Sequence, residues 1–152
     1  MHALVYDKST MPWDTTRGFE KRAVARPVLD PDDPLDADRV IVKVIYAGFC
    51  GSDRGIWNRV DFKGMIFDSL KRQRETVRVI GHEMVGEIVE VGAGAKDFSI
   101  GDRVILKIDW PSCHQKETDP MCPQCKKGNY LLCEKPGAEG LPLNQGGGFS
   151  DY

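Results

Sequence analysis

The stretch GHEMVGEIVEVGAGA, residues 81–95, joins a candidate metal-binding pair to a strand and a turn. The apolar residues spread over 83–91 predict a β-strand, and the glycines of 92–94 supply the turn that follows it. His82 and Glu83 stand at the start of this strand, and both residue types bind zinc. A His-Glu pair taken alone is usually an ordinary surface pair, so the other residues of the chain have to decide.

A third donor follows another strand. The β-branched run at 39–46 predicts the strongest strand of the chain, and Cys50-Gly-Ser-Asp53 comes directly after it. A cysteine, a histidine and a carboxylate together are the mixture found in open catalytic zinc sites. The competing interpretation is that Cys50 is a small buried hydrophobic residue. Spacing alone leaves both interpretations open.

The remaining pattern is β-rich with a few helices. Segments 19–26 and 103–108 predict further strands, and the Pro- and Asp-rich segment 27–38 predicts a loop. Ser52 and Asp53 are suitable N-cap residues for a short helix over 54–58.

A second helix is predicted after this one. Apolar residues at helical spacing precede a basic helix end at 71–74, namely Phe62, Met65, Ile66 and Leu70. The strands lie too close together in sequence for regular βαβ units, so we expect a mainly β fold with a few helices.

Two glycine-rich segments are candidates for nucleotide sites. Residues 92–97 begin like a dinucleotide fingerprint, but Asp97 occupies the place of its third glycine or alanine. A second turn follows, not a helix whose N-terminus could face a pyrophosphate. The glycines of 146–148 have no room for a helix after them. We therefore expect no nucleotide-binding unit in these 152 residues.

A second cysteine cluster predicts a structural zinc site. Cys122 and Cys125 have the two-residue spacing that lets both thiolates reach one ion, and Cys133 follows after a turn. A redox pair is the rival interpretation, and the third cysteine argues against it. Asp119, three residues before Cys122, is the preferred fourth ligand; Cys113 is softer but lies nine residues upstream.

Composition excludes several classes of protein. The chain has the length of one domain, and its formal charge of -2 gives no electrostatic case for nucleic acid or a membrane surface. No apolar run is long enough to span a membrane, and the N-terminus lacks a signal peptide. Five cysteines are an odd number for a disulfide framework. We expect a cytoplasmic protein.

These motifs together resemble the medium-chain zinc alcohol dehydrogenases. Gly81-His82-Glu83-x2-Gly86-x5-Gly92-x2-Ala95 matches the zinc-site signature of that family, and Cys50-Gly-Ser-Asp53, Gly101-Asp-Arg-Val104 and the cysteine cluster agree in order. The resemblance spans the whole chain. It implies one GroES-like β-barrel domain over 1–152 with a zinc-binding lobe at about 113–135. The segment Cys50–Gly55 is most similar to archaeal-type glucose dehydrogenases.

The resemblance also implies a role for each residue. Cys50 and His82 would ligate a catalytic zinc, and Glu83 would be a third ligand or a close partner. Asp53 would accept a hydrogen bond from the other ring nitrogen of His82, and Ser52 would bind the substrate hydroxyl and pass on its proton. Such enzymes oxidise an alcohol, polyol or aldose by zinc-assisted hydride transfer to NAD or NADP.

The sequence departs from the family pattern in three places. Gly55 replaces a histidine, and Asp119 stands where the lobe usually has its first cysteine. The chain also stops where the family continues into a Rossmann domain that carries a further zinc ligand. We therefore expect the isolated chain to be inactive and the full-length enzyme to be a homo-oligomer acting on a small molecule. The alternative is a stand-alone, zinc-stabilised GroES-like binding module.

Overall fold

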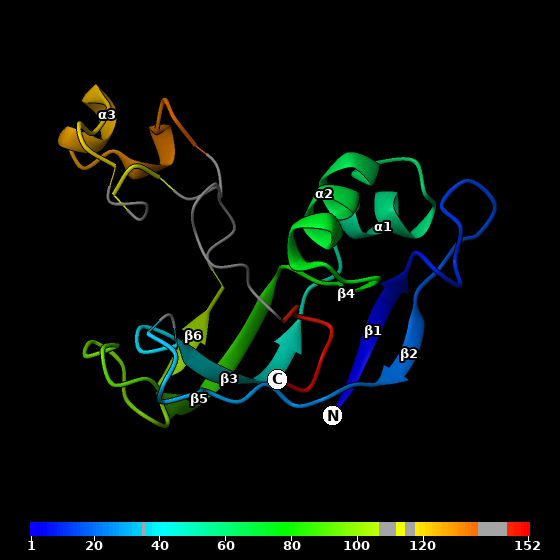
Figure 1. Ribbon diagram of the computed structural model, residues 1–152, viewed down its shortest axis with the longest axis horizontal. Coiled ribbons are helices and arrows are strands. Elements are labelled where there is room, and N and C mark those ends of the chain that lie inside the picture. The colour runs from blue at the N-terminus through cyan, green and yellow to red at the C-terminus, as the bar shows by residue number, and fades with distance from the viewer. Residues whose placement is uncertain (35, 107–111, 115–117, 137–145) are drawn as a thin grey trace. The chain divides into compact units, whose positions relative to one another are not determined.

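Two sets of strands and a small cysteine-rich lobe make up the chain (Figure 1). The computed structural model describes residues 1–34, 36–106, 112–114, 118–136 and 146–152. One compact unit comprises Met1–Leu106 with Asn144–Tyr152, and a second comprises Lys107–Leu143. Strands dominate the first unit, which confirms the expected mainly β fold with a few helices.

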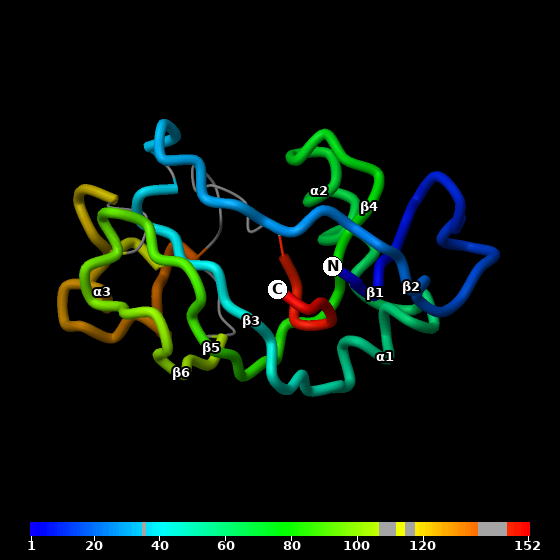
Figure 2. Tube along the Cα trace, turned by 90° about the horizontal axis from the view of Figure 1, so that it is seen from below, coloured from blue at the N-terminus to red at the C-terminus, as the bar shows by residue number. Residues whose placement is uncertain are grey.

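The first sheet is built on the N-terminal strand β1 (His2–Asp7). It pairs antiparallel with β2 (Glu20–Ala23) on one side and with β4 (Val77–Val79) on the other. The C-terminal segment lies beside the start of β1, where the Leu4 amide donates to the Phe149 carbonyl at 2.8 Å (Figure 2). Strand β2 lies within the predicted segment 19–26, whereas the sequence analysis identified neither β1 nor β4.

The second sheet carries the strands next to the predicted metal ligands. Its order is β3 (Val40–Ala47), β5 (Met84–Val91) and β6 (Arg103–Ile105), and both pairings are antiparallel. The register runs from Val40 opposite Val91 to Ala47 opposite Met84. The end of β3 therefore meets the start of β5. The predicted strands at 39–46 and 83–91 are confirmed to within a residue, and part of 103–108 lies outside the described residues.

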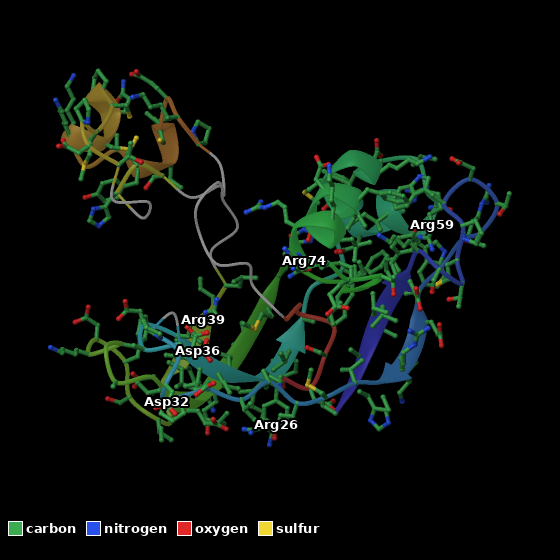
Figure 3. All side chains as sticks on the ribbon, in the orientation of Figure 1. Arg26, Asp32, Asp36, Arg39, Arg59 and Arg74 are labelled. Carbon is green, nitrogen blue, oxygen red and sulfur yellow. The ribbon has the colours of Figure 1, made fainter. Side chains whose placement is uncertain are left out.

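The predicted loop at 27–38 is confirmed, because the described residues of this segment form turns and irregular backbone. Asp36 fixes the end of the loop. Its carboxylate accepts hydrogen bonds from the Asp30 amide at 2.9 Å and from the Arg39 guanidinium at 2.6 Å (Figure 3). The pKa of Asp36 is lowered, chiefly because its carboxylate accepts that backbone hydrogen bond.

Two helices, α1 (Gly51–Trp57) and α2 (Lys63–Gln73), follow β3. The first begins earlier than the sequence analysis predicted, because Cys50 and not Ser52 or Asp53 is its N-cap residue. Asp53 instead lies in the first turn, where its carboxylate accepts a hydrogen bond from the Cys50 amide at 3.0 Å. The second helix is confirmed. It buries Ile66 and Leu70, as the apolar spacing predicted.

The helices and the first sheet share one apolar core. Tyr6 and Trp13 meet edge to face at a centroid distance of 5.4 Å. Arg59 is buried beside these rings, and its guanidinium donates to the carbonyls of Ile56 and Gly18 at 2.6 and 2.7 Å (Figure 3). The buried members of this core are Tyr6, Trp13, Ile56, Ile66, Leu70 and Ile80.

The second unit has a different kind of core. Its short elements are α3 (Pro123–Lys126) and the 3-10 helix η1 (Tyr130–Leu132). Among the described residues of the lobe, the buried cluster consists of Cys113, Cys122 and Cys125, with Met121, Tyr130 and Cys133 packed against it. Across the described chain, no helix has the length and apolar character needed to cross a membrane.

Candidate metal centres

The first candidate centre lies where β3 and β5 meet. Cys50 follows the end of β3 and His82 precedes the start of β5, so the antiparallel pairing places them side by side. The Gly48 amide donates to the Glu83 carbonyl at 2.9 Å and joins the two loops. Ligand atoms of Cys50, His82 and Glu83 all lie within 4.8 Å of one another. The structure thus brings together the three residues that the sequence analysis proposed for a catalytic zinc.

The His82 ring is turned so that its two nitrogens face different partners. Nε2 lies 3.1 Å from the Cys50 sulfur, and Nδ1 lies 3.4 Å from Asp53 Oδ1. Two ligands on one tetrahedral zinc, with bonds of about 2.3 and 2.0 Å, would be about 3.5 Å apart. The Cys50–His82 separation is a few tenths of an ångström shorter, which small side-chain rotations can correct.

Asp53 contacts both His82 and the backbone of Cys50. Its side chain is completely buried, and one oxygen accepts the Cys50 amide hydrogen bond. Its other oxygen, Oδ1, is buried and makes no hydrogen bond with any described residue. A histidine that binds a metal through Nε2 carries its proton on Nδ1, and that N–H faces Asp53 Oδ1. The unsatisfied carboxylate oxygen therefore fits a metal-binding His82.

Ser52 adds a hydroxyl to the same place. Its Oγ lies 2.8 Å from the Cys50 sulfur and 3.0 Å from His82 Nε2. Cys50, Ser52, His82 and Glu83 are all half-buried, so this cluster is not closed off within the core. Its three protein ligands and its accessibility are typical of a site with an open coordination position.

The C-terminal segment holds the two ligand loops in place, a feature that the sequence analysis missed. The Gly148 amide donates to the Gly81 carbonyl at 3.0 Å, and the Phe149 amide donates to the Ile80 carbonyl at 2.9 Å. The Phe149 ring stacks on Phe49, next to Cys50, at a centroid distance of 6.0 Å. The glycine pair before Phe149 is the sequence feature that indicates this contact. A side chain at Gly147 would collide with the Ile80 carbonyl, so the two segments can approach only because position 147 is glycine.

Gly55, where the sequence departs from the family pattern, is buried in α1. A Cβ atom at this position would lie 2.8 Å from Asp61 Oδ2. The Asp61 carboxylate therefore occupies the space that a larger residue at position 55 would need.

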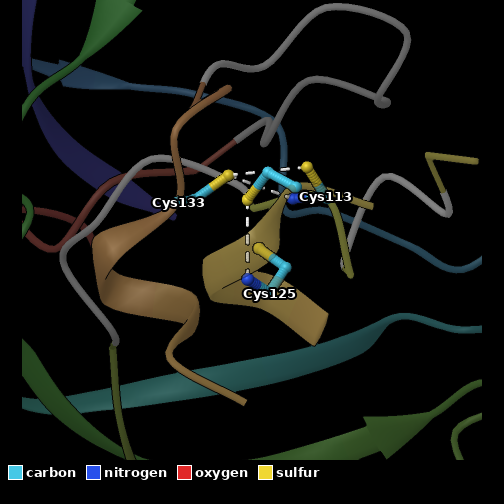
Figure 4. A group of neighbouring side chains, drawn as sticks. Cys113, Cys125 and Cys133 are labelled. Atoms are coloured by element: carbon cyan, nitrogen blue, oxygen red, sulfur yellow. Dashed lines mark hydrogen bonds between the residues drawn. The ribbon is translucent and has the colours of Figure 1, made fainter. Parts of the chain in front are cut away.

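The second candidate centre is the cysteine core of the lobe (Figure 4). The sulfurs of Cys113, Cys122, Cys125 and Cys133 all lie within 4.8 Å of one another. Cys113 and Cys133 are separated by 3.7 Å between sulfurs, close to the roughly 3.8 Å expected for two thiolates on one tetrahedral zinc. All five cysteines of the chain are free thiols. The lobe core therefore fits a closed four-thiolate site.

This geometry favours Cys113 over Asp119, which the sequence pattern made the preferred fourth lobe ligand. Asp119 is exposed and does not belong to the group, whereas Cys113 is completely buried within it. The Thr118 amide, next to Asp119, donates to the Cys113 carbonyl at 2.9 Å. The Cys113 amide also donates to the Cys133 sulfur at 3.4 Å. The nine residues between Cys113 and Cys122 in the sequence therefore do not keep their sulfurs apart.

The pKa values of two lobe cysteines are shifted in opposite directions. Donation from the Cys125 and Glu134 amides lowers the pKa of Cys122 to about 6. Burial raises the pKa of Cys125 to about 12. Because zinc binds the thiolate form, its binding to the lobe releases protons, chiefly from the less acidic thiols.

Comparison with known proteins identifies the family. The family model described as the alcohol dehydrogenase GroES-like domain matches residues 36–152, which is more than half of the chain. The chain therefore belongs to the GroES-like domain family of the alcohol dehydrogenases.

Individual relatives agree with this assignment. The chain is 35% identical over 115 residues to D-arabitol-phosphate dehydrogenase from Enterococcus avium, covering 76% of the chain and 28% of the relative. It is 34% identical over 125 residues to an NAD-dependent alcohol dehydrogenase from Sulfolobus acidocaldarius, covering 81% and 32%. Galactitol-1-phosphate dehydrogenase from Escherichia coli matches with a TM-score of 0.63 at 25% identity, covering 99% and 34%. The chain thus spans about a third of the length of these proteins.

Proposed function

We propose that this chain supplies the zinc-binding catalytic domain of a dehydrogenase that oxidises a secondary alcohol, polyol or aldose with NAD or NADP. The observation that carries the proposal is the open Cys50–His82–Glu83 cluster above the buried Asp53. Relatives with dehydrogenase names, two of them acting on sugar-alcohol phosphates, support the substrate class. They leave the individual substrate, including glucose, as a matter for assay.

The two candidate centres are proposed to have different roles. The lobe offers four thiolates, three of them buried, which suits a closed structural zinc site. The cluster at Cys50 offers three mixed ligands that are half-buried, which suits a catalytic zinc with a position left for substrate. A binding module without catalysis would need a closed site, but it would have no use for an open one. The accessible cluster therefore favours the enzyme over the stand-alone module.

Each residue around the open cluster has its own proposed role in the reaction. Zinc held by Cys50, His82 and Glu83 would polarise the substrate hydroxyl, and a bound nicotinamide would accept the hydride. Asp53 holds the His82 ring so that Nε2 faces the metal position. With Nε2 directed to the metal, the Ser52 hydroxyl is available to accept the hydrogen bond of the substrate hydroxyl and to move its proton toward solvent.

The nicotinamide site is proposed to lie outside these 152 residues. Turns follow β5 at 92–97, and among the described residues no helix begins there to face a pyrophosphate. The isolated chain is accordingly proposed to bind zinc but not to turn over substrate. We further propose that the complete enzyme is a homo-oligomer.

Metal stoichiometry tests this proposal directly. The purified chain should bind two equivalents of Zn²⁺, one in the lobe and a weaker one at Cys50. The Cys50→Ser variant should lose only the weaker equivalent, and the Cys122→Ser variant should weaken only the tighter one. If Cys50→Ser binds metal like the unaltered chain, the catalytic assignment is wrong. Turnover of polyols with NAD or NADP is then measured in the protein that also contains a cofactor-binding region.

A further inference from the structure

Gly48 directly follows β3 and lies two residues before Cys50. Glycine is needed here because there is no room for a side chain, not because the backbone conformation requires it. The glycines with positive φ include Gly81 and Gly101, but not Gly48. Any residue could therefore adopt the Gly48 backbone. A Cβ atom built on Gly48, however, would lie 2.5 Å from Glu83 Oε2 and 3.1 Å from Glu83 Cβ. The Glu83 side chain occupies the room that a side chain at position 48 would need.

The two residues are also joined through the backbone. The Gly48 amide donates to the Glu83 carbonyl at 2.9 Å, so the backbone of Glu83 is fixed against the loop that carries Cys50. Its side chain then passes over the bare backbone of Gly48, and its carboxylate stands within 4.8 Å of the ligand atoms of Cys50 and His82. The approach of the carboxylate to the metal position thus depends on the missing side chain at Gly48.

We propose that Gly48 is a positioning residue for the open metal site, whose lack of a side chain lets the Glu83 carboxylate reach the ion. This inference rests on the proposed function, because it concerns the same site. A methyl group at position 48 meets mainly the end of a flexible side chain, so the carboxylate moves more easily than the backbone does. The Glu83 Cβ has to yield only by a few tenths of an ångström. The loss should therefore fall on metal binding more than on folding.

A matched control lies three residues away. Gly51 has no positive φ, and a Cβ built on it would meet nothing within 4 Å. Gly51→Ala therefore makes the same chemical change in the same loop without touching Glu83. Gly48→Ala and Gly51→Ala differ in the one contact on which the inference depends.

The experiment measures binding of the second metal equivalent. The full chain is loaded with one equivalent of Zn²⁺ to fill the lobe and is then titrated with Co²⁺, followed by the visible ligand-field bands. Gly48→Ala should weaken Co²⁺ binding by about 10- to 100-fold and shift those bands, whereas Gly51→Ala should change the affinity by less than about threefold. Glu83→Gln should weaken binding to a similar extent. Adding Gly48→Ala to Glu83→Gln should then cost little more, because the carboxylate is already gone.

Each outcome decides one question. Equal affinities of Gly48→Ala and Gly51→Ala overturn the inference, and so does a full additional loss from Gly48→Ala in the Glu83→Gln background. If the second equivalent is retained unchanged in Cys50→Ser, the metal binds elsewhere and the proposed function fails instead. Should Gly48→Ala fail to fold, the double variant Gly48→Ala with Glu83→Gly should fold, because the opposing side chain is removed. A double variant that also fails to fold overturns the inference.

Discussion

Replacement of Cys113 by alanine tests the lobe geometry where sequence and structure disagree. Four cysteine sulfurs lie within 4.8 Å of one another in the lobe, and Cys113 is the completely buried one. A structural zinc site contributes about 10–16 kcal/mol of apparent binding free energy at neutral pH. Divided over four thiolates, this is roughly 2.5–4 kcal/mol for each. Cys113→Ala should therefore weaken metal binding in the lobe by about 10²- to 10³-fold.

Competition with a chelator gives the affinity, and Co²⁺ substitution gives the number of thiolates. The sulfur-to-cobalt charge-transfer absorbance of the lobe should fall by about a quarter in Cys113→Ala, since one of its four sulfur ligands is lost. The control is Asp119→Ala, which removes an exposed carboxylate six residues along the chain and should leave both the affinity and the absorbance unchanged. A loss of metal in Asp119→Ala together with normal binding in Cys113→Ala would refute the four-cysteine arrangement.

Three further substitutions test other parts of the molecule. Asp53→Asn replaces the buried carboxyl group that faces His82, the proposed ligand. It should weaken the second metal equivalent by about 10- to 100-fold in the same Co²⁺ titration; unchanged affinity contradicts the supporting role. Asp7 has its pKa lowered to about 2, chiefly by the Ser9 hydroxyl, so its folded-state pKa lies below the unfolded value. The ionised Asp7 carboxylate therefore stabilises the fold by about 2 kcal/mol above pH 5, and this contribution is lost as the pH falls toward 2. The free energy of unfolding in urea should be lower for Asp7→Asn than for the unaltered chain at pH 7, and the two values should converge in acid. Gly81 and Gly101 have similar φ angles of 96° and 95°, but of these two only Gly81 faces the Phe149 backbone. Gly81→Ala should therefore lower the free energy of unfolding by at least about 1 kcal/mol more than Gly101→Ala does. Equal losses would mean that the Phe149 contact contributes nothing.

The sequence predicted the strands whose residues alternate or branch at Cβ, and it missed those that depend on distant partners. The run at 39–46 became β3 almost to the residue. Strand β1 is hydrogen-bonded on one edge to β2 and on the other to β4, which lie later in the sequence. Its buried residues follow no strict alternation. Strand β4 is only three residues long and gives no period to detect. Both strands are defined by tertiary pairing, which a local pattern does not contain.

The candidate sites show the same division. The mixture of Cys50, His82 and Glu83 was recognised from residue type and family resemblance, and the β3–β5 register explains why residues so far apart in sequence meet. The sequence pattern favours Asp119 over Cys113, because Asp119 repeats the three-residue step from Cys122 to Cys125 and Cys113 lies nine residues upstream. The structure places the Cys113 sulfur within 4.8 Å of the other three lobe sulfurs, and no spacing rule reveals this proximity.

The architecture of the open site follows from the way its two loops are tied together. An antiparallel pair of strands brings two loops to the same edge but leaves their ends free to separate. Here three contacts oppose that separation: the Gly48–Glu83 backbone hydrogen bond, the Asp53 carboxylate between the Cys50 amide and His82, and the stacking of Phe49 on Phe149. None of these contacts uses a ligand atom of the proposed metal. The geometry of the proposed ligands can therefore be held before a metal binds, and the cluster remains half-buried, as the proposed function requires.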